Sequence, residues 1–314
     1  MSANNLKWIV FSLVVAAIGF IIVDPYYAHL FSILCVYAVL AVSFRFTMLV
    51  GEINLAHASF FGIGAYVSAA LTMQFGVPFV GALLLSGLIA ALISMVFGSI
   101  AFRVKGAYFL LLSFAFAEMV RLFFQNVWTD VLGGVNGIAG IPFPMEKYYG
   151  FIAILTLLLL YALYRLEKAN FGKILIAIRN SDDLSRSIGI NSMKYKVLAL
   201  VISSFIAGMS GSIFAHFNTV ISPQDFSFHL SIIILSFVII GGRNNFVGPI
   251  VGVILLTFVT EYIRGFGSFE TLAYGLAIIL AMLFLPNGLV GTLRSPNLQR
   301  AKKAKVDRQK EAKA

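Results

Sequence analysis

The chain has few charged residues for its length. Of its 314 residues, 11% are charged and 60% are hydrophobic, whereas soluble globular domains carry about 25% charged residues. A core formed by the chain itself cannot cover this much apolar surface, so a soluble protein is excluded and an all-α polytopic membrane protein is predicted. The net charge of +10 lies in loops and a tail, where positive residues set topology, so no nucleic acid partner is expected.

The sequence also lacks the motifs of catalysis and metal binding. Its single cysteine, Cys35, lies in an apolar run, which excludes a disulfide and a cysteine metal site. The histidines are scattered without metal-ligand spacing, and GxSxG and Walker A motifs are absent. We therefore predict no catalytic residues, no metal and no cofactor, and any ATP must be bound by partner subunits.

Long apolar runs fill most of the chain. A helix needs about 20 apolar residues to cross a bilayer, which predicts about eight to ten crossings. The candidate spans are residues 6–23, 29–44, 53–73, 78–101, 107–126, 148–166, 195–218, 228–241, 247–264 and 270–290. Asp24 and Pro25, rather than a small-residue cleavage site, follow the first run, so we interpret it as a span and not as a removable signal.

Basic residues predict how these spans are oriented. They form three clusters, Arg103 with Lys105, residues 165–196 and residues 294–313. Even numbers of predicted spans separate the clusters, so all three fall on one side, which the positive-inside rule makes cytoplasmic. Both termini are then cytoplasmic. Residues 292–314 are predicted to be a basic cytoplasmic tail, either attracted to anionic membrane lipid or solvated without a specific partner.

One long polar interruption, residues 171–191, separates two apolar runs in the middle of the chain. Its charged and helix-bounding residues are Arg179, Asp182, Asp183, Arg186, Gly189 and Asn191. The two aspartates are suited to begin a short helix, and the glycine and asparagine to end it. A segment of this length on the charged side of a membrane protein is expected to contact a partner, and a solvated loop without a partner is the alternative.

Polar residues also enter the apolar segments, and they suggest a translocation path. The candidate path residues are Asn54, His57, Gly62, Gly64 and Glu118. The amide and imidazole are costly at membrane depth unless they face a cavity or a partner. The two glycines let the backbone approach a neighbour closely, or let a helix break where it lines a path. Alternatively, Arg45 pairs with Glu52, the imidazole bonds to a neighbouring helix, and Glu118 pairs with Arg121 three residues later.

Several of these segments together resemble one family. The stretch GEINLAHASFFGIGAY, which begins at Gly51, is similar to the signature G-x-L-S-L-G-H-A-A-F-F-G-I-G-A-Y of the LivM-type membrane subunits of bacterial branched-chain amino acid ABC importers. The resemblance covers residues 30–291 and continues in RVKGAYFLLLSFAFAEMVRL, GGVNGIAGIP, GKILIAIRNSDDLSRSIGIN and LPNGLVG. The chain departs from the pattern at Asn54 and Ala56, where the family has Ser and Gly, and at Leu184 and Ser185, where it has Ala-Ala.

The resemblance implies an ABC importer permease fold over residues 1–291 in the bacterial inner membrane, with residues 167–194 as the loop that couples it to ATP hydrolysis. The implied partners are a second homologous permease, two ATP-binding cassette ATPases and a periplasmic or extracellular solute-binding protein. The implied function is uptake of branched-chain amino acids. The alternatives are a permease of the same family for urea, short amides or other amino acids, and an ATP-independent channel or secondary transporter, which has no need of the long central loop.

Overall fold

The structure, a computed structural model of the whole chain, describes residues 24–142, 148–263, 275–276, 278–279, 283 and 288–291. It divides into two compact units, Met1–Ile234 and Leu235–Ala314. The predicted span at residues 6–23 and the tail at 292–314 lie outside the described residues, as does most of the predicted span at 270–290.

The described residues contain six helices that are long and apolar enough to cross a membrane. These are α2 (Pro25–Met48), α3 (His57–Phe75), α4 (Phe79–Ala101), α5 (Ala107–Asn126), α7 (Tyr148–Lys168) and α10 (Ser192–Asn218). Two shorter apolar helices follow, α11 (Phe228–Gly241) and α12 (Gly248–Ile263). The prediction of an all-α polytopic membrane protein is confirmed. The predicted spans agree with these helices to within three residues at each end, with two exceptions. The helix α2 extends four residues beyond the predicted span 29–44 at each end, and α3 begins four residues after the predicted start at 53.

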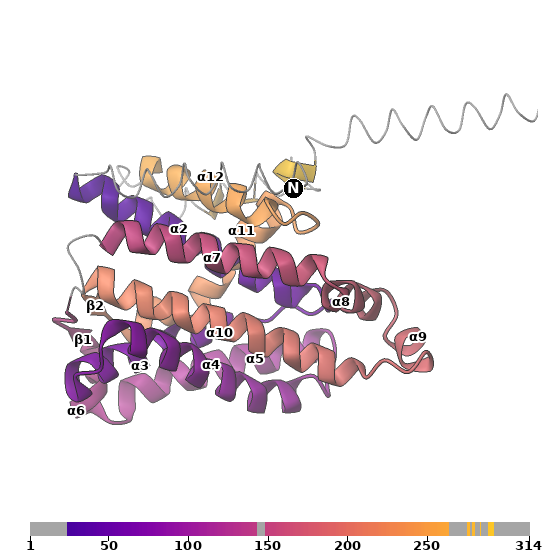
Figure 1. Cartoon of the computed structure of the whole chain (residues 1–314), viewed down its shortest axis with the longest axis horizontal. Helices are drawn as coiled ribbons and strands as arrows, with labels where there is room; N and C mark the ends of the chain where they lie inside the picture. The colour runs from indigo at the N-terminus through magenta and orange to yellow at the C-terminus, as the bar shows by residue number, and fades with distance from the viewer. Residues whose placement is uncertain are drawn as a thin grey trace, which may run out of the picture. The chain divides into compact units, whose positions relative to one another are not determined.

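Short elements connect the long helices. They are α6 (Thr129–Leu132), η1 (Gly134–Asn136), β1 (Ile138–Ala139), α8 (Asn170–Asn180), α9 (Asp182–Ser187), β2 (Val220–Ile221) and η2 (Pro223–Phe226). The two strands pair antiparallel, with Ile138 opposite Ile221. Figure 1 shows α8 and α9 at one end of the first unit, which we call the charged end, and α6, β1 and β2 at the other, which we call the loop end.

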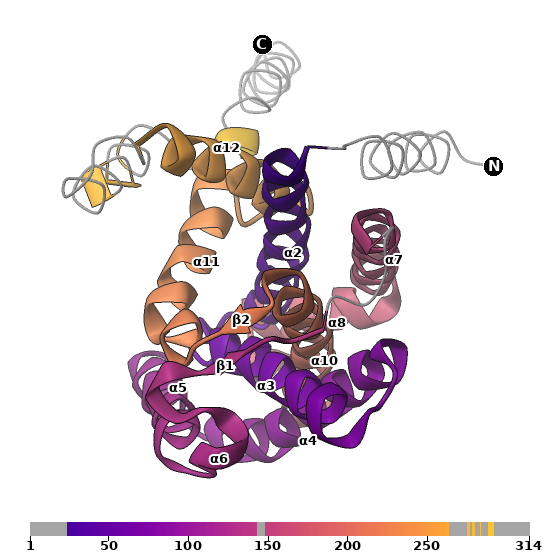
Figure 2. The same cartoon turned by 90° about the vertical axis from the view of Figure 1, so that its left-hand side faces the viewer.

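The centre of the first unit is α10, which packs against α2, α3 and α4 (Figure 2). Small residues allow this, because a Cβ on Gly64 would lie 2.1 Å from the carbonyl oxygen of Gly208, and one on Gly211 would lie 1.9 Å from the carbonyl oxygen of Phe61. The backbones of α3 and α10 are therefore in direct contact, as is common between membrane helices.

This packing decides between the two expectations for Gly62 and Gly64, close approach of the backbone or a break in the helix. The helix is continuous from His57 to Phe75, and a Cβ on Gly62 would lie 2.7 Å from the side chain of Phe226. The two glycines thus serve close approach rather than a change of direction. The irregular backbone lies before the helix, in the connection between α2 and α3.

Candidate functional site

The polar segment at the charged end is more helical than predicted. It contains α8 and then α9, which begins at Asp182 as the two aspartates suggested. Sequence reasoning missed the cap of α9, the side-chain oxygen of Ser181, which accepts a hydrogen bond from the amide of Leu184 at 3.3 Å.

Gly189 follows α9 with φ +86°, a conformation that favours glycine. Asn191 does not end α9 but caps α10, because its side chain accepts a hydrogen bond from the amide of Lys194.

Asp182 ties this segment to two other elements. Its Oδ2 lies 3.1 Å from Arg186 Nη2, 3.2 Å from Lys196 Nζ in α10 and 3.3 Å from Lys105 Nζ in the connection between α4 and α5. These contacts also place the first two basic clusters at the same end of the unit, in agreement with the topology argument. Burial of the carboxyl raises its pKa, but the facing Ser192 hydroxyl and the lysine charges outweigh this effect and lower the pKa of Asp182 from 3.8 to about 2.

The outer face of α9 is apolar and exposed. Leu184 in α9 and Ile188, the residue that follows the helix, are 66% and 70% exposed. The predicted contact residues Arg179, Asp183 and Arg186 are also exposed. Apolar side chains between charges at the tip of a helix that is otherwise held in place are typical of a surface that a partner covers.

A second ion pair joins α2 to the end of α7. Arg45 donates two hydrogen bonds to the carboxylate of Glu167, at 2.7 and 2.9 Å, and its side chain is 2% exposed. The expected pairing of Arg45 with Glu52 is therefore wrong. The chain turns at Gly51, where φ is +94°, and this directs Glu52 to the connection after α4, where it accepts a hydrogen bond from the amide of Gly106.

The same turn brings the charged end to the polar segment before α3. A Cβ on Gly51 would lie 3.3 Å from Cγ of Arg179, the penultimate residue of α8. Asn54 and His57, three and six residues after Gly51, are buried, with exposed fractions of 1% and 0%. A movement of α8 would therefore reach the start of α3 through direct contact.

Side chains of neighbouring helices hold this connection. The hydroxyl of Ser113 in α5 accepts a hydrogen bond from the amide of Leu55 at 3.1 Å, and the hydroxyl of Ser231 in α11 donates one to the carbonyl of Leu55. His57 Nε2 lies 3.0 Å from Ser43 Oγ in α2, the neighbouring-helix contact that the alternative interpretation expected. No local sequence pattern marks these serines, which is why sequence reasoning missed them.

Some polar atoms here have no partner within the described part of the chain. They are Nδ2 of Asn54, Nδ1 of His57 and Oγ of Ser59. Buried polar groups are nearly always hydrogen-bonded to protein or to ordered water. Three such atoms thus lie within six residues at the start of α3.

Glu118 lies nearer the loop end and is paired. Its carboxylate accepts hydrogen bonds from Arg121, at 2.9 Å for Nε and also from Nη2. Arg121 Nη1 in turn donates to Gln224 in η2 at 3.3 Å. The geometry matches the ion pair that the alternative interpretation expected, and the pair joins α5 to η2.

Residues 26–286 match the family described as "Branched-chain amino acid transport system / permease component". The chain is similar to the high-affinity branched-chain amino acid transport system permease protein LivM of Escherichia coli K12, with 29% identity over 78% of this chain and 65% of the relative. It is also similar to a probable branched-chain amino acid transport permease protein LivH of Methanocaldococcus jannaschii, with 24% identity over 76% of this chain and 82% of the relative.

The match to the LivM proteins of Escherichia coli and Salmonella typhimurium thus spans 65% of their length, just under two thirds. No solved structure gives a significant match to the chain.

Proposed function

Because the chain belongs to the family of permease components of branched-chain amino acid transport systems, we propose that it is the membrane-spanning permease subunit of an ABC importer for branched-chain amino acids. It forms the path in the bacterial inner membrane together with a second, homologous permease. Two ATPases supply the energy, and an external solute-binding protein delivers the amino acid.

The observation that carries this proposal is the exposed apolar face of α9. Leu184 and Ile188 lie at the tip of the charged end, and Asp182 fixes the helix that bears them to Lys105 and Lys196. A channel or secondary transporter has no need of such a rigid, apolar projection. A subunit driven by a separate ATPase needs a surface that transmits force.

A route for that force runs through described contacts. A push on α9 acts on α10 through Lys196, and α8 touches Gly51 through the stem of Arg179. The buried pair of Arg45 and Glu167 couples the end of α7 to α2. Closure of the ATPases would in this way shift the polar segment at Asn54 and His57, where unpartnered polar atoms can meet a solute.

The test is uptake into proteoliposomes that contain this chain with its co-expressed permease, ATPases and solute-binding protein. We expect radiolabelled leucine to accumulate inside against its gradient only when ATP is supplied on the ATPase side. Equilibration of leucine without ATP would contradict the importer and favour a channel. ATP-driven uptake of urea or a short amide in preference to leucine would overturn the substrate class and leave the permease role intact.

A further inference from the structure

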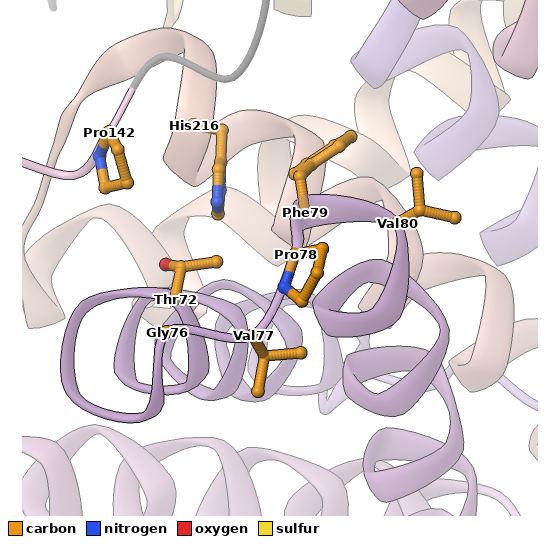
Figure 3. Close-up of a pocket in the computed structure, with 8 residues that line it drawn as sticks. All are labelled: Thr72, Gly76, Val77, Pro78, Phe79, Val80, Pro142 and His216. Carbon is orange, nitrogen blue, oxygen red and sulfur yellow. The ribbon is translucent and has the colours of Figure 1, made fainter.

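A pocket at the loop end has the polar groups of a ligand site. Its volume is about 380 Å³, at the lower end of the roughly 300–1,000 Å³ found for small-molecule sites. The lining includes the apolar side chains of Val77, Phe79, Val80 and Pro142, with Thr72 and His216. In Figure 3 the ring of His216 points from α10 into the space between Pro142, Thr72 and Pro78.

His216 presents an unpaired hydrogen-bond acceptor to this pocket. Its Nδ1 lies 3.2 Å from the carbonyl oxygen of Ser212, and because a carbonyl can only accept, Nδ1 carries the proton. In a neutral imidazole the other nitrogen is then an acceptor. Nε2 has no partner among the described residues, and the residue is 0% exposed.

The start of α4 also lines this pocket, through Phe79 and Val80. The helix has 23 residues, and its cap position, Pro78, provides no side-chain cap. The amides of Phe79, Val80 and Gly81 precede the first hydrogen bond of the helix, which Ala82 donates to the carbonyl of Pro78, and together with the helix dipole they favour an anionic group. The ring of Phe79, the first residue of α4, lies 4.7 Å from the ring of His216, so the start of α4 packs beside the imidazole.

These groups are complementary to a zwitterion that has N–H donors and an anionic group close together. We propose that the pocket binds the α-ammonium group of a free apolar amino acid at His216 and its carboxylate at the start of α4, with the side chain against Val77 and Val80. This inference rests on the proposed function, which supplies the amino acid. A lipid headgroup that carries an ammonium and a phosphate group shares this chemistry, and the experiment separates the two sources.

The probe is a leucine analogue with a photoreactive diazirine in its side chain, added to the assembled transporter in phosphatidylcholine nanodiscs. After irradiation, mass spectrometry locates the modified peptides. We expect labelling of residues 72–80 or of the end of α10, displaced by excess leucine. Isoamylamine and 4-methylpentanoate each lack one charged group, and we expect each to compete at least about tenfold more weakly.

Variants test the role of His216 directly. We expect His216→Phe to reduce labelling about tenfold, the factor for a lost hydrogen bond to a charged group, and His216→Gln, which keeps an acceptor, to retain most of it. His29→Phe is the matched control, because His29 packs against Phe217 in the same unit and does not line the pocket. Full labelling of His216→Phe would overturn the proposal, as would competition by isoamylamine or 4-methylpentanoate equal to that of leucine.

Three further outcomes separate the amino acid from a lipid headgroup as the ligand, and this inference from the proposed function. The quaternary ammonium of phosphatidylcholine has no N–H, so labelling that falls severalfold in phosphatidylethanolamine nanodiscs would assign the pocket to a lipid headgroup instead. ATP-driven leucine uptake by the same purified complex in proteoliposomes, without labelling of the pocket, would overturn this inference alone. Absence of uptake by the wild type would overturn the proposed function.

Discussion

At the scale of single residues, two carboxylates fix the charged end. Glu167 binds a nearly fully buried arginine, and Asp182 binds three cations through one oxygen. Neither set of partners is close in sequence except Arg186, four residues after Asp182. Spacing along the chain therefore predicted the position of the aspartate in its helix but not what it binds.

The pair of Arg45 and Glu167 provides a stability prediction. Removal of one partner of a buried ion pair costs about 3–5 kcal/mol because the other charge stays buried without compensation. We expect Arg45→Met to lower the free energy of unfolding by this amount in a titration with SDS, and the double variant Arg45→Met, Glu167→Leu to recover much of the loss.

The control for this prediction is Lys173→Met, which removes an exposed positive charge in α8 and should change stability by less than about 0.5 kcal/mol. A loss below about 1 kcal/mol for Arg45→Met would contradict the account, since that is the value of a solvent-exposed pair.

Asp182 provides a prediction about pH. Its folded pKa of about 2 lies below the unfolded value of 3.8, so its contribution to stability is complete above pH 3.8 and is lost as the pH falls through about 2. We expect the ¹³C shift of its carboxyl carbon to stay constant between pH 6 and pH 3.5. In Lys196→Met the pKa should rise and the shift should change within this range. A wild-type carboxyl that titrates at or above its unfolded value would disprove the network.

At the scale of elements, hydrophobic runs predicted the helices of the first unit well because each must supply its own backbone hydrogen bonds in lipid. The details that depend on tertiary contact were not predictable in this way. Gly62 and Gly64 suggested either close approach or a break in α3, and only the structure shows that Phe226 and Gly208 occupy the space of a Cβ. The residues 171–180 looked like loop because their apolar positions are too few to span a membrane, but they form α8.

The crossing of α3 and α10 is tested by Gly64→Ala. The added methyl group would meet the backbone of Gly208, which cannot move aside as a flexible side chain could. We expect a loss of about 1–3 kcal/mol, seen as a lower midpoint of heat inactivation in detergent.

Gly81→Ala is the matched control, because Gly81 is also inside a helix and its Cβ would meet only Val77 Cγ1, at 3.1 Å. Its effect should stay within about 1 kcal/mol. Equal midpoints for the Gly64 and Gly81 variants would show that the two helices do not cross as closely as described.

At the scale of the whole molecule, the chain is a multi-pass membrane protein of the branched-chain amino acid permease family. The family was predictable from the order of several motifs along the sequence, and its match to residues 26–286 confirms it. The pocket at His216 was not predictable, because its lining comes from separate parts of the chain. These are the end of α3 with the connection to α4, the start of α4, the segment after β1, and α10. Only the folded chain brings them together.

The most direct test of the central claim, that α9 receives the force of the ATPases, is quantitative mass spectrometry of complexes purified through a tag on this chain. We expect the wild type to recover two ATPases and a second permease. The double variant Leu184→Glu, Ile188→Glu should lose the ATPases at least about tenfold and keep the permease. The control Val135→Glu changes an apolar residue of similar exposure (63%) at the loop end and should keep both. A wild type recovered alone, or ATPases retained by the double variant, would contradict the account.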